Sequence, residues 1–227
     1  MDISPAYMLA IGQIIWIDLL LSGDNAVVIA LACRSLPENQ RRWGIIFGAS
    51  AAIVLRILFA LVISQVLLVP FLMTVGGVLL LWIAVKLLRG EEAGPANIVA
   101  SIVLWQAIRT IAMADAVMSL DNVVAISAAS RGDYWLFIFG LAFSIPLIVV
   151  GATLITKLIQ RFPLFIWAGA ALLGWISGEM IAKDPGLHQF GLPEGAAIHY
   201  GSALLGAAFV VALGYWLRRR ESQAEPA

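Results

Sequence analysis

Long apolar runs, separated by short groups of charged residues, proline and glycine, dominate the chain. A helix needs roughly 20 apolar residues to cross about 30 Å of hydrocarbon, and most of these runs are of that length. They predict an all-α polytopic membrane protein in which residues 1–227 form a single transmembrane domain. The seven predicted membrane-spanning helices cover residues 7–32, 43–69, 71–88, 98–129, 134–156, 162–182 and 196–217.

The composition supports this prediction and excludes other classes of protein. Of the 227 residues, 62% are hydrophobic and 12% are charged, so a water-soluble domain is excluded. The 14 basic and 14 acidic residues balance, so the lipid bilayer and not nucleic acid is the expected partner. The single cysteine, Cys33, cannot form an internal disulfide. The first apolar run lacks a basic leader and a small-residue cleavage site, so we expect a retained helix there.

The distribution of Lys and Arg predicts the orientation in the membrane. Ten lie after the odd-numbered spans: Arg34, Arg41, Arg42, Lys86, Arg89, Lys157, Arg161, Arg218, Arg219 and Arg220. The remaining connections hold only Arg131 and Lys183. Because positive flanks stay in the cytoplasm, we expect the N-terminus outside and the C-terminus in the cytoplasm.

An internal repeat is the most informative feature of the sequence. DLLLSGDN at 18–25 aligns with DAVMSLDN at 115–122 at a constant offset of 97 residues. The polar pairs in register are Asp18 and Asp115, Ser22 and Ser119, Asp24 and Asp121, Asn25 and Asn122, and Arg34 and Arg131. A second match aligns residues 76–86 with 169–179 and places Lys86 opposite Glu179.

The repeat predicts a specific architecture. Residues 7–89 form repeat one, residues 98–183 form repeat two, and the seventh helix at 196–217 is unpaired. Each repeat has three spans, so the second copy crosses the membrane in the opposite direction. Such 3+3 inverted repeats are typical of secondary transporters, whose sites lie near the midplane between the repeats.

The acidic motifs are the predicted metal site. A carboxylate in mid-membrane costs at least about 2.5–3.5 kcal/mol, so these residues need a compensating role. On a regular helix Asp18, Ser22 and Asn25 share a face, whereas Asp24 points about 120° away. Either Asp24 reaches a different partner, or the helix unwinds at Gly23. Carboxylate, amide and hydroxyl oxygens suit Mg²⁺, Ca²⁺ or Mn²⁺ better than Zn²⁺ or Cu²⁺.

Other polar residues in the predicted spans have supporting roles. Ser22 and Ser119 accompany the acidic residues of the two motifs. Arg56 lies deep in the second span, as a counter-ion of the site or as part of a structural ion pair. Lys86 and Glu179 belong to opposite sides of the membrane, so we expect each to serve a gate or an entry path.

The two motifs, the stretch GGVLLLWIAVKLL and the seven spans together resemble the TerC family of integral membrane proteins. The resemblance implies a transporter of the lysine-exporter type, with Mn²⁺ as the exported ion and the bacterial inner membrane as its location. The residues that it marks as metal ligands are Asp18, Asp24, Asn25, Asp115, Asp121 and Asn122.

Two other functions compete with transport. Resemblance to plant members of the family suggests a partner for membrane-protein assembly or insertion. An intramembrane aspartyl protease needs two carboxylates that share a proton, whereas the acids here form repeated pairs beside Asn, so we do not expect an enzyme. Carboxylates that release a metal can return protonated, which makes proton exchange a reasonable coupling. The oligomeric state stays open.

Overall fold

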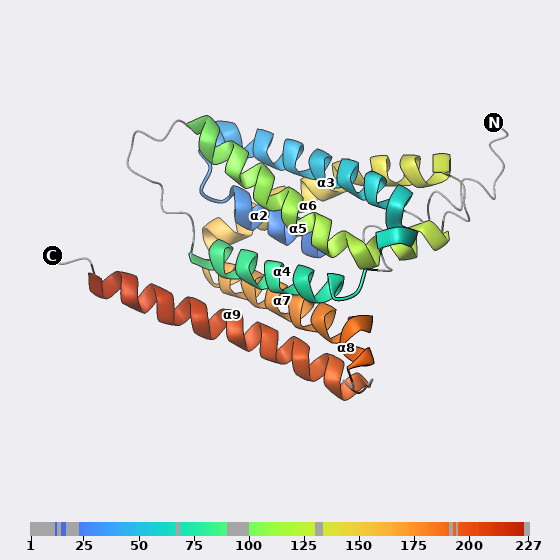
Figure 1. Ribbon diagram of the computed structural model, residues 1–227. Coiled ribbons are helices and arrows are strands. Elements are labelled where there is room, and N and C mark those ends of the chain that lie inside the picture. The colour runs from blue at the N-terminus through green and yellow to red at the C-terminus, as the bar shows by residue number, and fades with distance from the viewer. Residues whose placement is uncertain are drawn as a thin grey trace. The chain divides into compact units, whose positions relative to one another are not determined.

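The computed structural model describes residues 12, 15–16, 23–66, 69–89, 100–129, 134–190, 193 and 195–224. Within these residues every regular element is a helix, which confirms the all-α prediction for the described part of the chain (Figure 1). The helices are α2 (Gly23–Cys33), α3 (Glu38–Val66), α4 (Leu72–Arg89), α5 (Ala100–Ala129), α6 (Tyr134–Arg161), α7 (Leu164–Ala182), α8 (Pro185–Gln189) and α9 (Ala196–Ala224).

The described residues contain four segments that are long and apolar enough to cross a membrane. They are Glu38–Phe59, Leu72–Arg89, Leu164–Ala182 and Ala196–Arg220, and α2 is a shorter apolar helix. These segments support the membrane assignment. The count of seven spans stays a prediction, because parts of the first, second, fourth and fifth predicted spans lie outside the residues described in full.

Several helices extend beyond the apolar runs that predicted them. α3 begins at Glu38, before the predicted start at residue 43, and α6 continues to Arg161, past the predicted end at residue 156. The added turn of α3 is polar, and that of α6 carries Lys157, Gln160 and Arg161. Backbone hydrogen bonds continue a helix into the interfacial region, where hydropathy no longer marks it.

The chain forms two compact units that alternate along the sequence. Unit 1 comprises Met1–Val66 and Ser101–Lys157, and unit 2 comprises Leu67–Ala100 and Leu158–Ala227. α2, α3, α5 and most of α6 therefore belong to unit 1, while α4, α7, α8 and α9 belong to unit 2. Equivalent helices of the two predicted repeats fall in the same unit.

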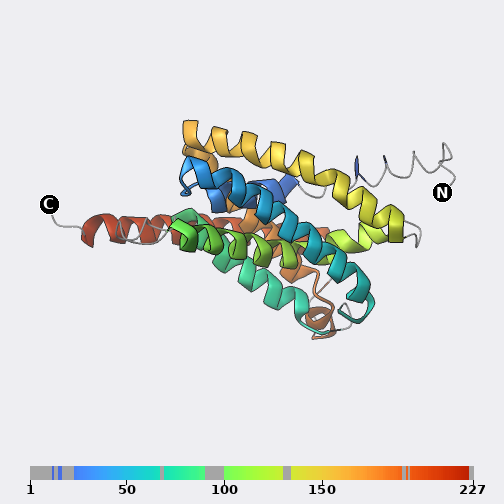
Figure 2. The ribbon, with the colours of Figure 1, turned by 90° about the horizontal axis from the view of Figure 1, so that it is seen from above.

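The equivalent helices also run in opposite directions within their unit. α3 and α6 of unit 1 are antiparallel in two perpendicular views, and so are α4 and α7 of unit 2 (Figures 1 and 2). An inverted duplication predicts this pairing, although the duplication itself stays a prediction.

Glycines allow the helices of unit 1 to approach closely. A Cβ added at Gly48 in α3 would lie 2.5 Å from Cδ1 of Ile111 in α5. A Cβ added at Gly151 in α6 would lie 3.7 Å from Cβ of Ala26, so α6 packs against α2 at this level. These contacts join α3 to α5 and α6 to α2 within unit 1.

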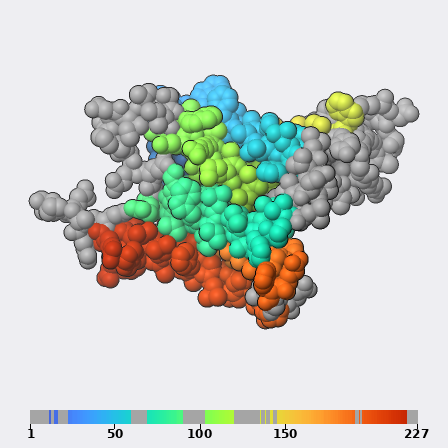
Figure 3. Space-filling model, in the orientation of Figure 1, coloured from blue at the N-terminus to red at the C-terminus, as the bar shows by residue number. Residues whose placement is uncertain are grey.

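In unit 2, a stripe of small residues joins α7 to α9. Gly174 and Gly178 of α7 face Gly206 and Ser202 of α9, and a Cβ added at either α7 glycine would overlap the α9 backbone. Close backbone contact of this kind is a common means of packing helices in membranes. α9 forms an outer surface in Figure 3, and its exposed side chains between residues 200 and 216 include large apolar ones, as expected for contact with lipid.

The Asp184 side chain accepts hydrogen bonds at the N-termini of two helices in unit 2, α4 and α8. Its Oδ2 accepts hydrogen bonds of 2.7 Å from both the backbone N–H and the hydroxyl of Thr74 in α4, and its Oδ1 accepts one of 2.7 Å from the Gly186 N–H in α8. Nearby, Phe71 has a φ of 60°, a left-handed conformation that only surrounding contacts can hold. Burial alone would raise the pKa of Asp184, but the hydrogen bonds outweigh it and lower that pKa from 3.8.

Candidate metal-binding site

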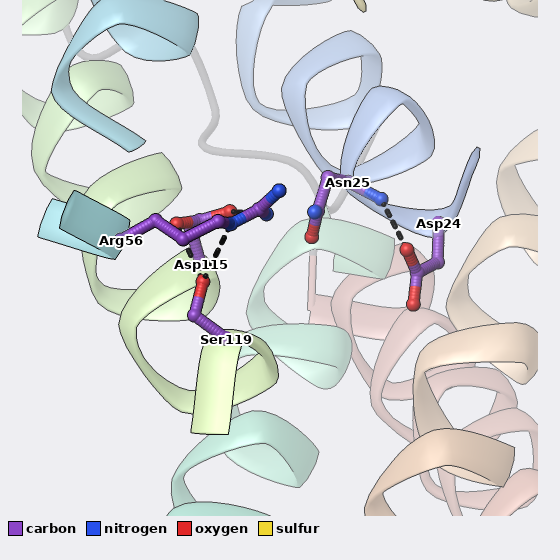
Figure 4. Close-up of polar contacts among 5 residues, drawn as sticks. All are labelled: Asp24, Asn25, Arg56, Asp115 and Ser119. Atoms are coloured by element: carbon purple, nitrogen blue, oxygen red, sulfur yellow. Dashed lines mark hydrogen bonds and ion pairs between the residues drawn. The ribbon is translucent and has the colours of Figure 1, made fainter. Parts of the chain in front are cut away.

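Unit 1 brings together residues from both motifs. α2 supplies Asp24 and Asn25, α5 supplies Asp115 and Ser119, and α3 supplies Arg56 (Figure 4). Four predicted site residues have side chains outside the described part of the chain. Asp18 and Ser22 lie outside the described residues, and the side chains of Asp121 and Asn122, which follow in α5, lie outside them as well.

Arg56, Asp115 and Ser119 form a connected group of buried charges and hydrogen bonds. The Nη2 atom of Arg56 lies 2.8 Å from Oδ1 of Asp115, and its Nε donates a 3.2 Å hydrogen bond to Ser119 Oγ. Ser119 Oγ in turn donates to Oδ2 of Asp115 at 2.9 Å. Arg56 is 1% exposed and Asp115 is 3% exposed. Both carboxylate oxygens of Asp115 are therefore engaged by the protein.

Arg56 forms an ion pair with a motif carboxylate, which it reaches from a different helix. This contact fits both interpretations of Arg56 from the sequence, a counter-ion of the site and a structural ion pair. A buried ion pair repays its desolvation only when the geometry is good and the remaining polar atoms are satisfied, as they are for Asp115. Asp115 and Ser119 also lie on one face of α5, as the four-residue spacing predicts.

Asn25 is the opposite case, because its side chain is buried without partners. It is 4% exposed, and neither Oδ1 nor Nδ2 has a hydrogen bond. Most buried side-chain polar atoms in proteins are paired, so each exception needs an explanation such as a bound ion or water. An amide oxygen is a suitable ligand for a hard divalent cation.

Asp24 and Asn25 lie next to each other at the beginning of α2. In Figure 4 the Asn25 amide lies between the Arg56 guanidinium and the Asp24 carboxylate. Oδ1 of Asp24 accepts a 2.8 Å hydrogen bond from the Asn25 backbone N–H. α2 is helical from Gly23 onward. Asp18 and Ser22 lie outside the described residues, so the predicted shared face and the unwinding before Gly23 both stay predictions.

The two other supporting residues belong to unit 2. The Lys86 ammonium lies 5.6 Å from the centre of the Trp82 ring, and the Glu179 carboxylate lies 2.9 Å from the Lys183 ammonium. Lys183 was not among the predicted site residues, although its spacing of four residues from Glu179 in a helix favours such a pair. Roles for Lys86 and Glu179 in a gate remain predictions.

Among the described residues, no group of three or more His, Cys, Asp and Glu side chains comes together. The predicted ligand set also includes Asp18 and Asp121, so the described residues do not test it as a whole. They show that the motif contains one saturated carboxylate, at Asp115, and one unsatisfied amide, at Asn25.

Comparisons with known proteins identify relatives over nearly the whole chain. Residues 3–222 match the model of the integral membrane protein TerC family. The chain is 40% identical to the uncharacterized membrane protein YjbE of Bacillus subtilis, covering 95% of this chain and 98% of the relative. It is 24% identical to the UPF0053 inner membrane protein YgdQ of Escherichia coli K12, over 84% of this chain and 86% of that one. No solved structure matches.

Proposed function

We propose that this chain, which belongs to the TerC family of integral membrane proteins, is a secondary transporter that exports a divalent metal cation. The proposed cargo is Mn²⁺, and the proposed location is the bacterial inner membrane, with the N-terminus outside and the C-terminus in the cytoplasm. The inner-membrane assignment is supported by the relative YgdQ, which is described as an inner membrane protein. The opposite directions of equivalent helices support an inverted-repeat transporter.

The observation that carries this proposal is the orphaned amide of Asn25. A buried polar group without a partner costs about 1–3 kcal/mol, and a cation at Asn25 Oδ1 would remove part of that cost. The neighbouring Asp24 supplies a carboxylate on the same turn of α2, and Asp18, Asp121 and Asn122 remain candidate ligands from the sequence. Oxygen ligands alone favour a hard divalent cation, and the family resemblance selects Mn²⁺ among them.

Transport is tested with purified protein in liposomes that contain a Mn²⁺-sensitive dye. Wild-type protein should move Mn²⁺ across the membrane, whereas Asp24→Asn, which removes a charge with little change of volume, should not. Thr156→Val is the matched control, because the Thr156 hydroxyl is buried in unit 1 but bonds only within its own helix, to the Ala152 carbonyl at 2.6 Å. Equal flux through the wild type and Asp24→Asn would contradict the site. No flux through the wild type would favour an assembly or insertion role.

Proton exchange is the proposed coupling. Carboxylate ligands must be deprotonated to bind a metal, so Mn²⁺ binding should release protons. Calorimetry in two buffers of different ionisation enthalpy measures this release directly. A heat of binding that does not depend on the buffer would rule out proton exchange while leaving Mn²⁺ transport intact.

A further inference from the structure

We infer that one end of unit 2, where α4 and α9 finish and α7 begins, binds the phosphate groups of anionic phospholipids. Six basic residues gather at this end and are called the basic cluster: Lys86, Arg89, Arg161, Arg218, Arg219 and Arg220. The ends of α4 and α9 lie on the same side of unit 2 in two perpendicular views (Figures 1 and 2). The inference does not depend on transport, because none of these residues belongs to the predicted metal site.

Arg218 lies where the three helices meet. Its Nη2 donates a 3.2 Å hydrogen bond to the Leu88 carbonyl near the end of α4, and its guanidinium carbon lies 5.3 Å from the centre of the Trp167 ring in the first turn of α7. Leu88 packs against the same part of α9, since a Cβ added at Gly214 would overlap its side chain. These contacts fix the Arg218 guanidinium before a ligand arrives, which lowers the entropy cost of binding a phosphate there.

Aromatic rings accompany the other basic residues. The guanidinium carbon of Arg220 lies 3.8 Å from the centre of the Trp216 ring, and that of Arg161 lies 5.9 Å from the centre of the Phe162 ring. In the described part of the chain, every cation–π contact involves a member of the basic cluster. Stacking uses the face of a guanidinium, and its edge keeps the N–H groups that bind phosphate oxygens.

The charge at this end of unit 2 is positive. Among the described residues of unit 2, the acidic side chains are Glu179 near the end of α7 and Asp184 before α8, both distant in sequence from the basic cluster. Four further acidic residues adjoin the cluster in the sequence, with side chains outside the described part: Glu91, Glu92, Glu221 and Glu225. Basic residues outnumber acidic ones here even if all four are counted, so an anion is the complementary ligand.

The position at the ends of apolar spans selects a lipid among the possible anions. The candidate spans Leu72–Arg89 and Ala196–Arg220 both end in the basic cluster, the level at which head groups lie. Tyr215 and Trp216 are 56% and 48% exposed, and Leu164 at the beginning of α7 is 76% exposed. These apolar surfaces beside the guanidiniums suit the glycerol and acyl region of a phospholipid. A free phosphate ion would gain nothing from them.

Lipid binding to the full chain in detergent tests the inference. Native mass spectrometry counts the lipids that stay bound from an equimolar mixture of phosphatidylglycerol and phosphatidylcholine, and wild-type protein should prefer phosphatidylglycerol. The typical contribution of one basic residue near a membrane surface predicts that Arg218→Gln and Arg220→Gln each lower the affinity for phosphatidylglycerol about fivefold. Arg42→Gln is the matched control, because Arg42 is an exposed arginine of α3 in unit 1, and its affinity should stay within about twofold of wild type.

Arg220→Gln keeps the test valid if Arg218→Gln does not fold, because the ring that Arg220 contacts belongs to its own helix. No preference of the wild type for phosphatidylglycerol overturns the inference, and so do equal losses in Arg220→Gln and Arg42→Gln, which would indicate general charge attraction.

Thermal unfolding separates a lipid from a free anion. Phosphatidylglycerol added to wild-type protein in detergent should raise the Tm, whereas sodium phosphate at the same concentration and ionic strength should not. An equal rise with sodium phosphate overturns the lipid as the occupant. Neither experiment uses Mn²⁺, so their failure leaves the proposed transport function unaffected.

Discussion

Asn25→Leu should make the protein more stable and at the same time abolish its response to Mn²⁺. Leucine has the same branching as asparagine, so it fills the same direction of space with methyl groups in place of the amide oxygen and nitrogen. Asn25 is 4% exposed and both amide atoms lack partners, so no hydrogen bond is lost in the substitution. An ordinary buried asparagine, bonded to its neighbours, would respond in the opposite way.

The magnitude follows from the unsatisfied amide. Leaving a buried polar group unpaired costs about 1–3 kcal/mol, so replacing the amide should raise the free energy of unfolding by up to that amount. Crowding of the neighbours by the larger leucine reduces this gain. A gain of about 1 kcal/mol raises the Tm of a chain of 150–250 residues by roughly 2–4 °C. For the wild type, Mn²⁺ at about 100 times its Kd should add about 2.7 kcal/mol, a larger shift than that from the substitution.

The assay is thermal unfolding in detergent, followed by the fluorescence of the eight tryptophans with and without Mn²⁺. Asn25→Leu should begin at a higher Tm and show no Mn²⁺ shift. Thr156→Val, whose hydroxyl already has a partner, should gain no stability from loss of an orphan group and should keep the Mn²⁺ shift. An Asn25→Leu protein that is destabilised and still stabilised by Mn²⁺ would refute both the orphan amide and the ligand assignment.

Three further predictions concern the fold. Gly178→Ala should separate α7 from α9 and lower the Tm by several degrees, whereas Gly201→Ala, where the added Cβ meets nothing within 4 Å, should be neutral or stabilising by up to about 1 kcal/mol. The pKa of Asp184 is lower in the folded than in the unfolded protein, so its carboxylate stabilises the fold above the unfolded pKa, and this stability is lost as pH falls through the folded pKa. Asp184→Asn should therefore lower the Tm at pH 7 and have a smaller effect near pH 3. For the orientation, Phe190→Cys should react with an impermeant thiol reagent from outside and Gln160→Cys should not; the reverse pattern contradicts the topology but not the inverted relation of the halves.

The sequence predicts the ends of a helix well where an apolar run alone determines its length. α4 runs from Leu72 to Arg89, within one residue of the predicted span at each end, because the apolar run and the lipid have the same length. Prediction is poorer at polar flanks, as for α3. The short α8 was missed altogether, although Asp184 followed by Pro185 is a recognisable start signal for a helix.

The candidate site was predictable as a list of residues but not as a set of contacts. The repeat identified Asp115 and Asn25, and the depth of Arg56 in its span marked that residue as unusual. The partners of these side chains depend on which helices pack together, and Arg56 and Asp115 are 59 residues apart in sequence. Asp184 and Thr74, 110 residues apart, are a second example. Spacing within one helix gives no information about such pairs.

The contrast between Asp115 and Asn25 has a physical logic in a protein with so few polar residues. Burying charge in an apolar environment is expensive, and Arg56, Asp115 and Ser119 offset that cost by bonding to one another. An open group such as Asn25 is destabilising until something binds. We therefore expect cargo to bind where hydrogen bonds are missing, and the fold to be held where they are complete.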